Sequence, residues 1–200
     1  MKKLLAFLLF VLLFSIMGCT ATTEEDPVVF SDDLPFEIDM KNDSLKILQL
    51  TDLHLTYGVD ANDRATLNGI ETLAKSDDFD LIVITGDMVM SVSGPALFSL
   101  LISEMESLEI PWTFVFGNHE TDYNSYKSYL DKMVDTEYLY FKVGPELEDG
   151  GVGNFRIVFN KDGVPFYTVY FLDSHAERAN YTEEEGIYDF VKASQVEWVD

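Results

Sequence analysis

The sequence predicts an α/β fold in which a mixed sheet is covered by helices. Two observations carry this prediction. Short apolar runs alternate with longer segments of helical spacing from residue 45 to residue 134, and an Asp-Gly pair separates two strand-like runs further on. Alternating strands and helices are typical of a parallel sheet with crossover helices. An Asp-Gly pair between two strands instead predicts an antiparallel hairpin.

Three short apolar runs in the first part of the domain are predicted to be strands. The run at 80–85, DLIVIT, is continuous and largely β-branched, as expected of a strand that is buried on both faces. A segment with helical spacing follows each run, and Pro95 suits the first turn of the second helix. The predicted order is strand 45–51, helix 62–76, strand 80–85, helix 94–108, strand 110–116 and helix 123–134.

The second half is predicted to add an antiparallel pair of strands to this sheet. Residues 155–160 and 165–174 flank Asp162-Gly163, a strong hairpin signal. Ser194, with Glu197 three residues later, has the pattern of a capping box and predicts that a helix begins there. Because a domain seldom stops at the first turns of an amphipathic helix, we expect residues 37–200 to be the N-terminal part of a larger, C-terminally incomplete domain.

The N-terminus has the pattern of a bacterial lipoprotein signal peptide over residues 1–18. Two lysines precede an apolar run at 4–17, which is shorter than the roughly 20 residues that span a membrane. Cys19 is the only cysteine, and the sequence IMGC resembles a lipobox, so lipidation would explain a lone thiol in an exported chain. An ordinary signal peptide with an incidental cysteine is the alternative. We expect export, a lipid anchor at Cys19 on the outer face of a bacterial membrane, and an acidic tether at 19–36.

The charge balance limits the partners of the protein. The chain carries 36 acidic and 13 basic residues, a formal net charge of −23. Such a surface argues against nucleic acid, whose phosphates are bound by Lys and Arg, and against electrostatic attraction to anionic lipid. A small phosphorylated substrate remains compatible with it, because bound metal ions invert the local field.

Polar residues follow three of the predicted strands at the point where each strand ends. Asp52 and His54 follow the first strand, Asp87 the second, and Asn118 and His119 the third. Because the carboxyl ends of neighbouring parallel strands open onto one crevice, we expect these side chains to meet there. Such a mixture of nitrogen and oxygen ligands suits two divalent ions such as Zn, Mn or Fe. Two closely spaced ions would activate a water molecule and clamp phosphoryl oxygens.

Two residues at the end of the third strand are candidates for catalysis. His119 is adjacent to a predicted ligand and has the chemistry to donate a hydrogen bond to phosphate or a proton to the leaving oxygen. Glu120 is expected either to orient that imidazole or, equally, to be a solvated surface carboxylate. His175 also follows a strand, and we expect a surface or rim histidine there in preference to a ligand. The simpler alternative for each predicted ligand is that it only caps a helix or occupies a turn or loop, without binding metal.

These residues resemble a known family. Asp52-x-His54, Gly86-Asp87 and Gly117-Asn118-His119-Glu120 look like the first three motifs of the calcineurin-like metallophosphoesterases. FLDS at 171–174 followed by SQVEW at 194–198 is similar to the branch related to purple acid phosphatases, and the resemblance covers residues 45–200.

The resemblance implies a role for each of these residues. Asp52, His54 and Asp87 would bind the first of two divalent ions, Asp87 and Asn118 the second, and His119 would be the catalytic histidine. The implied reaction is hydrolysis of a phosphomonoester or phosphodiester by a hydroxide that bridges the ions. The family also has a lone His and a Gly-His-x-His motif, and neither occurs before residue 200. A surface lipoprotein that binds metal or a phosphorylated ligand without catalysis, or an inactive truncated fragment, is therefore the alternative.

Overall fold

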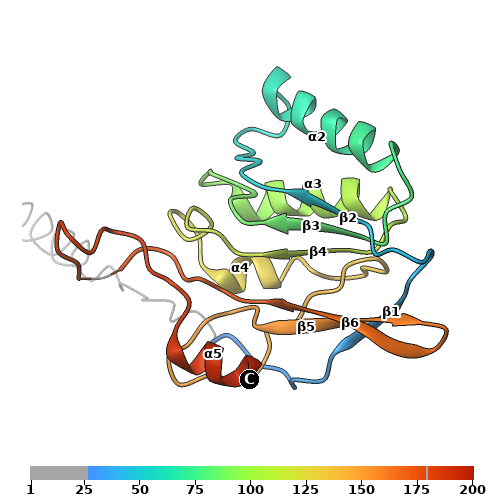
Figure 1. The fold of residues 1–200 in the computed structure, drawn as a ribbon. Coiled ribbons are helices and arrows are strands. Elements are labelled where there is room, and N and C mark those ends of the chain that lie inside the picture. Colours follow the sequence, from blue (N-terminus) through green and yellow to red (C-terminus); the bar gives the residue numbers. More distant parts are fainter. Residues whose placement is uncertain (1–26, 179) are drawn as a thin grey trace, which may run out of the picture.

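In the computed structural model, which describes residues 27–178 and 180–200, two three-stranded sheets pack face to face between helices (Figure 1). The predicted signal peptide, Cys19 and the first part of the predicted tether lie outside the described residues. Among the helices of the described part, none has the length and apolar character needed to cross a membrane.

The first sheet contains the three predicted parallel strands. Its order is β2-β3-β4, and both pairs are parallel. Helices α2 and α3 provide the crossovers and lie on the same side of this sheet (Figure 1). The bounds are β2 Ile47–Leu50, α2 Ala61–Ala74, β3 Leu81–Thr85, α3 Gly94–Glu106 and β4 Trp112–Val115.

The central strand β3 is buried because it has apolar layers on both of its faces. Ile82 and Ile84 belong to a core cluster that includes Phe98 of α3. Leu81 and Val83, which point to the opposite face, belong to a second cluster formed with the other sheet. This placement accounts for the continuous β-branched run in the sequence.

The sequence predicts that the antiparallel pair extends the first sheet, but the pair belongs to a second, separate sheet. Its order is β1-β5-β6, with β1 parallel to β5 and β5 antiparallel to β6. This sheet covers the face of β3 opposite to α3, which would otherwise expose apolar side chains to water. The strands are β1 Phe36–Asp39, which the sequence pattern did not predict, β5 Phe155–Lys161 and β6 Val164–Phe171.

The hairpin between β5 and β6 has the turn that its sequence predicts. Asp162 and Gly163 both have positive φ, 53° and 74°. A two-residue turn of this kind matches the twist of the strands that it joins. The structure thereby confirms the antiparallel hairpin.

Part of the predicted tether contacts the domain. The backbone N–H of Ser31 donates to the carbonyl of Gly144 at 2.9 Å. Nζ of Lys142 lies 2.8 Å from Oδ1 of Asp32. The packed structure therefore begins before residue 37.

Two helix predictions need correction. Helix α4, Tyr126–Leu130, is shorter than the predicted 123–134. Helix α5, Ala193–Val199, is capped at Lys192 and not at Ser194, because Oε1 of Gln195 accepts a hydrogen bond from the backbone N–H of Lys192 at 2.7 Å. Gln195 therefore takes the place in the cap that the sequence pattern gave to Glu197.

Candidate metal and phosphate site

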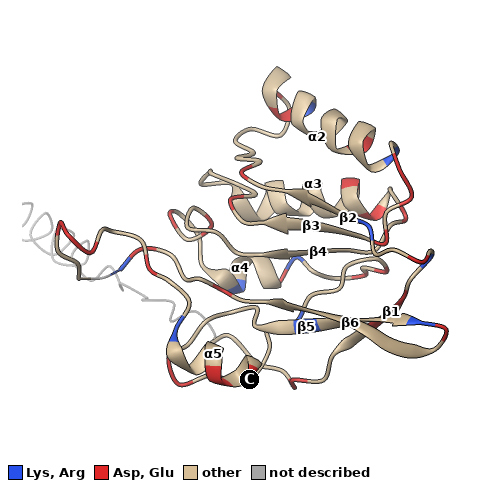
Figure 2. Cartoon of the chain, in the orientation of Figure 1, with Lys and Arg blue, Asp and Glu red and all other residues tan. Residues whose placement is uncertain are grey.

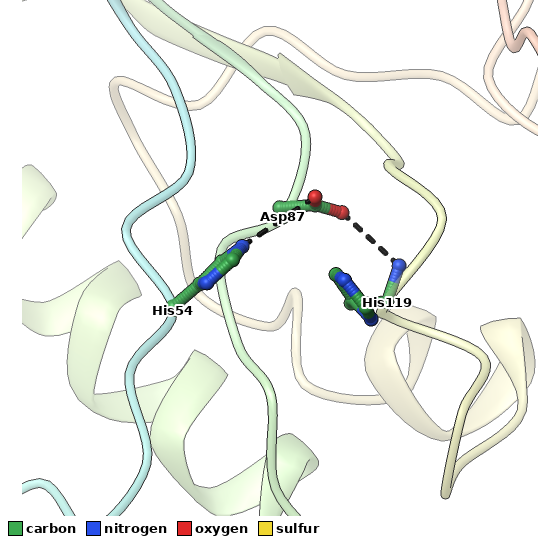
Figure 3. Close-up of side chains that lie close together, drawn as sticks. All are labelled: His54, Asp87 and His119. Carbon is green, nitrogen blue, oxygen red and sulfur yellow. Dashed lines mark hydrogen bonds and ion pairs between the residues drawn. The ribbon is translucent and has the colours of Figure 1, made fainter.

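Three predicted site residues converge where β2, β3 and β4 end. The possible ligand atoms of His54, Asp87 and His119 all lie within 4.8 Å of one another (Figure 3). Nε2 of His54 is 3.5 Å from Oδ2 of Asp87, and the backbone N–H of His119 donates to Oδ1 of Asp87 at 3.0 Å. Asp52 is close to the same group, with Oδ1 3.7 Å from Nε2 of His54. The strand ends thus bring Asp52, His54, Asp87 and His119 close together, and their roles as ligands or catalytic groups stay predictions.

The backbone that presents these side chains is in an uncommon conformation. Asp52, His54 and Asp87 have φ of 53°, 46° and 53°, in the left-handed region that residues other than glycine rarely adopt. Bonds between the two loops hold them there: the N–H of Asp52 donates to Gly86 O at 3.2 Å, and that of His54 donates to Asp87 O at 3.0 Å. Strained backbone that the surroundings hold in this way is concentrated at functional sites.

Gly117 leaves the space that the carboxylate of Asp87 occupies. A Cβ added at residue 117 would collide with Oδ1 of Asp87 and with its backbone nitrogen. The Gly-Asn-His-Glu motif therefore begins with glycine because the end of β4 passes directly against the Asp87 side chain.

Glu120 is neither a solvated surface carboxylate nor the group that orients His119, the two roles that the sequence predicts for it. It is fully buried, and its carboxylate accepts hydrogen bonds from four backbone N–H groups. Burial raises the pKa of Glu120, while backbone hydrogen bonds, those from Gly117, Val89 and Met88, act in the opposite direction. Four donors match the four lone-pair positions of an ionised carboxylate. The donors are the N–H groups of Gly117 at 2.7 Å, Asp87 at 3.2 Å, Met88 at 2.6 Å and Val89 at 3.2 Å.

The carboxylate that orients His119 belongs to Asp122, which the sequence reasoning missed. Nδ1 of His119 lies 2.7 Å from Oδ2 of Asp122. This hydrogen bond raises the pKa of His119. The backbone N–H of Asp122 also donates to His119 O at 3.2 Å, so the two residues share a tight turn. The signal available in the sequence was an acid three residues after the histidine, a spacing that a turn brings together.

Asn118 joins the site through a shared cavity. A cavity of about 290 Å³ has Asp52, Asp87 and Asn118 in its lining. Ser174 and His175, which follow the second sheet, line it as well. A neighbouring cavity of about 410 Å³ also includes Asn118, and its other lining residues are Thr121, Asp122, Tyr123, Ala176 and Glu177. The site therefore opens into a polar groove between the two sheets' ends.

The residues present fit divalent metal ions. They offer carboxylate oxygens, an amide oxygen and imidazole nitrogens, a mixture suited to Zn, Mn or Fe. Strands β2, β3 and β4 carry no charged residue, and Asp52, Asp87 and Asp122 lie in the loops that follow them, while further acidic segments lie elsewhere in the fold (Figure 2). Positive ions would offset the repulsion between the carboxylates in the loops that follow these strands.

Comparison with known proteins is consistent with this geometry. A family model described as calcineurin-like phosphoesterase matches residues 45–200. The chain belongs to the calcineurin-like phosphoesterase family. The match starts just before β2 and includes every site residue described above. The resemblance seen in the sequence is thereby confirmed.

Individual curated proteins are also similar in sequence to this chain. Phosphatase DCR2 of Saccharomyces cerevisiae is 30% identical over 178 residues, which cover 78% of this chain and 31% of the relative. A "Probable cyclic nucleotide phosphodiesterase" of Psychrobacter arcticus is 33% identical over 88 residues, covering 38% of this chain and 31% of the relative. An uncharacterized protein of Schizosaccharomyces pombe is 25% identical over 178 residues, covering 80% of this chain and 34% of the relative. The chain thus spans about a third of the length of the relatives that it matches.

Proposed function

We propose that this protein hydrolyses phosphate esters with the help of two divalent metal ions, at the outer surface of a bacterial cell. The observation that carries the proposal is the convergence of His54, Asp87 and His119 at the strand ends of a calcineurin-like phosphoesterase domain. Relatives named phosphatase and phosphodiesterase support a substrate that is a phosphomonoester or a phosphodiester.

Each predicted ligand has a place in this proposal. Asp52, His54 and Asp87 would hold one ion, and Asp87 with Asn118 would hold the other. When bound, such ions polarise phosphoryl oxygens and lower the pKa of water. The left-handed backbone at three of these positions fixes the ligands before an ion arrives, so little reorganisation is needed on binding.

His119 is the proposed proton donor. Because Asp122 is bonded to Nδ1, the nitrogen left to meet the substrate is Nε2. The carboxylate of Asp122 raises the pKa of the ring and so favours the protonated form. A protonated Nε2 can donate to a phosphoryl oxygen or protonate the leaving oxygen.

The proposed location follows from the sequence of the N-terminus. An apolar run after two lysines and a single Cys19 support export and lipid attachment. With Cys19 changed to serine, we expect the protein to lose labelling by radioactive palmitate and to move from the membrane fraction to the soluble fraction. A protein that stays in the membrane fraction without palmitate would contradict this part of the proposal.

The test of the activity is hydrolysis of p-nitrophenyl phosphate and of its bis ester. We expect turnover that EDTA abolishes and that Mn or Zn restores. His119→Asn should reduce the rate more than 100-fold, in the range known for loss of a key catalytic donor. Asp162→Asn, at the hairpin turn away from the site, is the control and should match the wild type. If the protein binds metal but turns over no faster than His119→Asn, it is a binding protein and the proposal fails.

A further inference from the structure

His175 lies in the same cavity as the predicted metal ligands but comes from the other sheet. It follows β6, four residues after Phe171. The cavity of about 290 Å³ has Asp52 and Asp87 in one part of its lining and Ser174 with His175 in another. His175 and the predicted metal ligands therefore line one cavity, although they come from different sheets.

The backbone of His175 is held by a buried network. Its φ is 66°, in the left-handed region, and its N–H donates to Oδ1 of Asp173 at 2.8 Å. Asp173 is only 1% exposed, and its own N–H donates to Oδ1 of Asn154 at 3.1 Å. Nε2 of Gln195 donates both to Asn154 Oδ1 at 2.7 Å and to Asp173 O at 2.6 Å. These bonds hold the strained backbone from which the imidazole projects.

The imidazole has unused hydrogen-bonding capacity. Its Nε2 is buried and has no hydrogen-bond partner among the described residues. A buried polar atom without a partner is uncommon and calls for an explanation. The ring does not belong to the cluster of possible ligands formed by His54, Asp87 and His119, so an ion bound there does not supply that explanation.

Charge gives His175 a distinct position in the groove. Among the described residues that line the two cavities, it has the one basic side chain. A phosphate ester carries its negative charge on the phosphoryl oxygens, and these would otherwise face mainly carboxylates. The acidic residues in the lining are Asp52, Asp87, Asp122, Glu177 and Asp189.

We propose that His175 is a substrate-contacting residue that binds a phosphoryl oxygen of the ester in the cavity that it shares with the predicted metal ligands. Because Nε2 is buried in this structure, contact with the ester requires the ring to turn about χ2 until one of its nitrogens faces the cavity. This proposal rests on the proposed phosphoesterase function. It differs from the expectation of a surface or rim histidine, because the backbone of residue 175 is fixed beside the cavity and the ring would take part in binding.

The first test compares substrate binding in variants of the full chain. His175→Asn removes the ring while keeping a residue that tolerates left-handed backbone. We expect its KM for bis(p-nitrophenyl) phosphate to rise on the order of tenfold, as for loss of one charged hydrogen bond, with a smaller change in kcat. Ser174→Ala is the control, because Ser174 lines the same cavity, and its KM should match that of the wild type. His175→Gln repeats the test if the asparagine variant folds poorly, and zinc content is measured in each protein.

The second test does not depend on turnover. The chain has three histidines, so their ring nitrogens can be followed by ¹H–¹⁵N NMR in the zinc-loaded wild type. We expect inorganic phosphate to shift the nitrogens of His175. An unchanged KM in both variants, a loss of zinc, or a His175 signal that phosphate leaves in place would each overturn the proposal. If the wild type hydrolyses neither ester, the proposed function fails, while the phosphate titration still decides the role of His175.

Discussion

The two sheets differ in how many side chains they deliver to the site, and strand direction explains the difference. In the sheet β2-β3-β4 all strands are parallel, so three carboxyl ends open at one edge and bring Asp52, His54, Asp87, Asn118 and His119 together. In the second sheet β5 and β6 run in opposite directions, so the carboxyl end of only one of them reaches that edge. That end supplies His175. A parallel sheet therefore concentrates functional groups where an antiparallel hairpin supplies one.

Both sheets use a buried polar side chain to fix the backbone at these ends. In the first sheet Glu120 accepts four backbone N–H groups and ties the end of β3 to the end of β4. In the second sheet Asn154, Asp173 and Gln195 bond one another and hold the peptide of His175. The Glu120 carboxylate thus fixes the backbone of several predicted ligands at once, whereas the network around Asp173 fixes one residue, His175. Substitutions in the two sheets test this difference.

The largest effect is expected from Asp87→Asn, which changes the residue shared by both proposed ions. Loss of an outer partner of a ligand costs 10–100-fold, so changing this ligand should lower kcat/KM by more than about 100-fold. Asp162→Asn is a matched control, because both aspartates have φ of 53° and asparagine tolerates that backbone. The measurements are ester hydrolysis and bound metal per chain. Equal activity of the two variants would show that the first sheet does not hold the site.

The next largest effect is expected from Glu120→Ala, which leaves four N–H groups at the ends of β3 and β4 without their acceptor. We expect a loss of about 3 kcal/mol in the free energy of unfolding, measured in urea, because unpaired buried donors are costly. The affinity for zinc should fall as well.

Glu106→Ala is the control for this prediction. Glu106 also bridges secondary-structure elements, accepting hydrogen bonds from Nε1 of Trp112 at 2.8 Å and the N–H of Glu137 at 2.6 Å, but it is away from the site. It should cost stability and leave zinc affinity unchanged. A Glu120 variant with normal zinc affinity would show that the carboxylate stabilises the sheet without positioning the ligands.

A moderate effect is expected from Asp122→Asn, and it depends on pH. Asp122 raises the pKa of His119, so the protonated ring persists to higher pH in the wild type. Asparagine removes the negative charge and lowers that pKa, so the alkaline limb of kcat should move to lower pH. At a pH above the alkaline limbs of both proteins, kcat of the variant should be lower than that of the wild type by about tenfold for each pH unit that separates the two limbs. A profile that coincides with the wild type would exclude His119 as the proton donor.

The smallest effect is expected in the second sheet, from Gly163→Ala at the hairpin turn. Gly163 has φ of 74° and open space where a Cβ would stand, so the change tests backbone conformation alone. We expect a loss of about 1 kcal/mol in the free energy of unfolding, with no change in activity. Gly69→Ala, in helix α2 and equally open, should instead stabilise by about 0.5–1 kcal/mol. Loss of activity in Gly163→Ala would mean that the hairpin is coupled to the site.

The sequence by itself determined which strands end in polar residues and which strands are joined by a tight turn. These features depend on local order along the chain: DLIVIT is buried wherever a parallel sheet forms, and Asp162-Gly163 favours a hairpin in any context. The meeting of Asp52, His54, Asp87 and His119 followed from the same reasoning, because one helix between strands imposes a parallel crossover.

Only the tertiary structure decided the partners of the remaining groups. Glu120 was identified as a site residue, but its four amide donors come from two different strand ends, and no periodicity reports that contact. Asp122 became the partner of His119 through a turn, and His175 entered the cavity because the hairpin packs as a second sheet over the first. The local sequence encodes strands, helices and turns. The partners of a polar side chain depend instead on which segments the tertiary packing brings into contact.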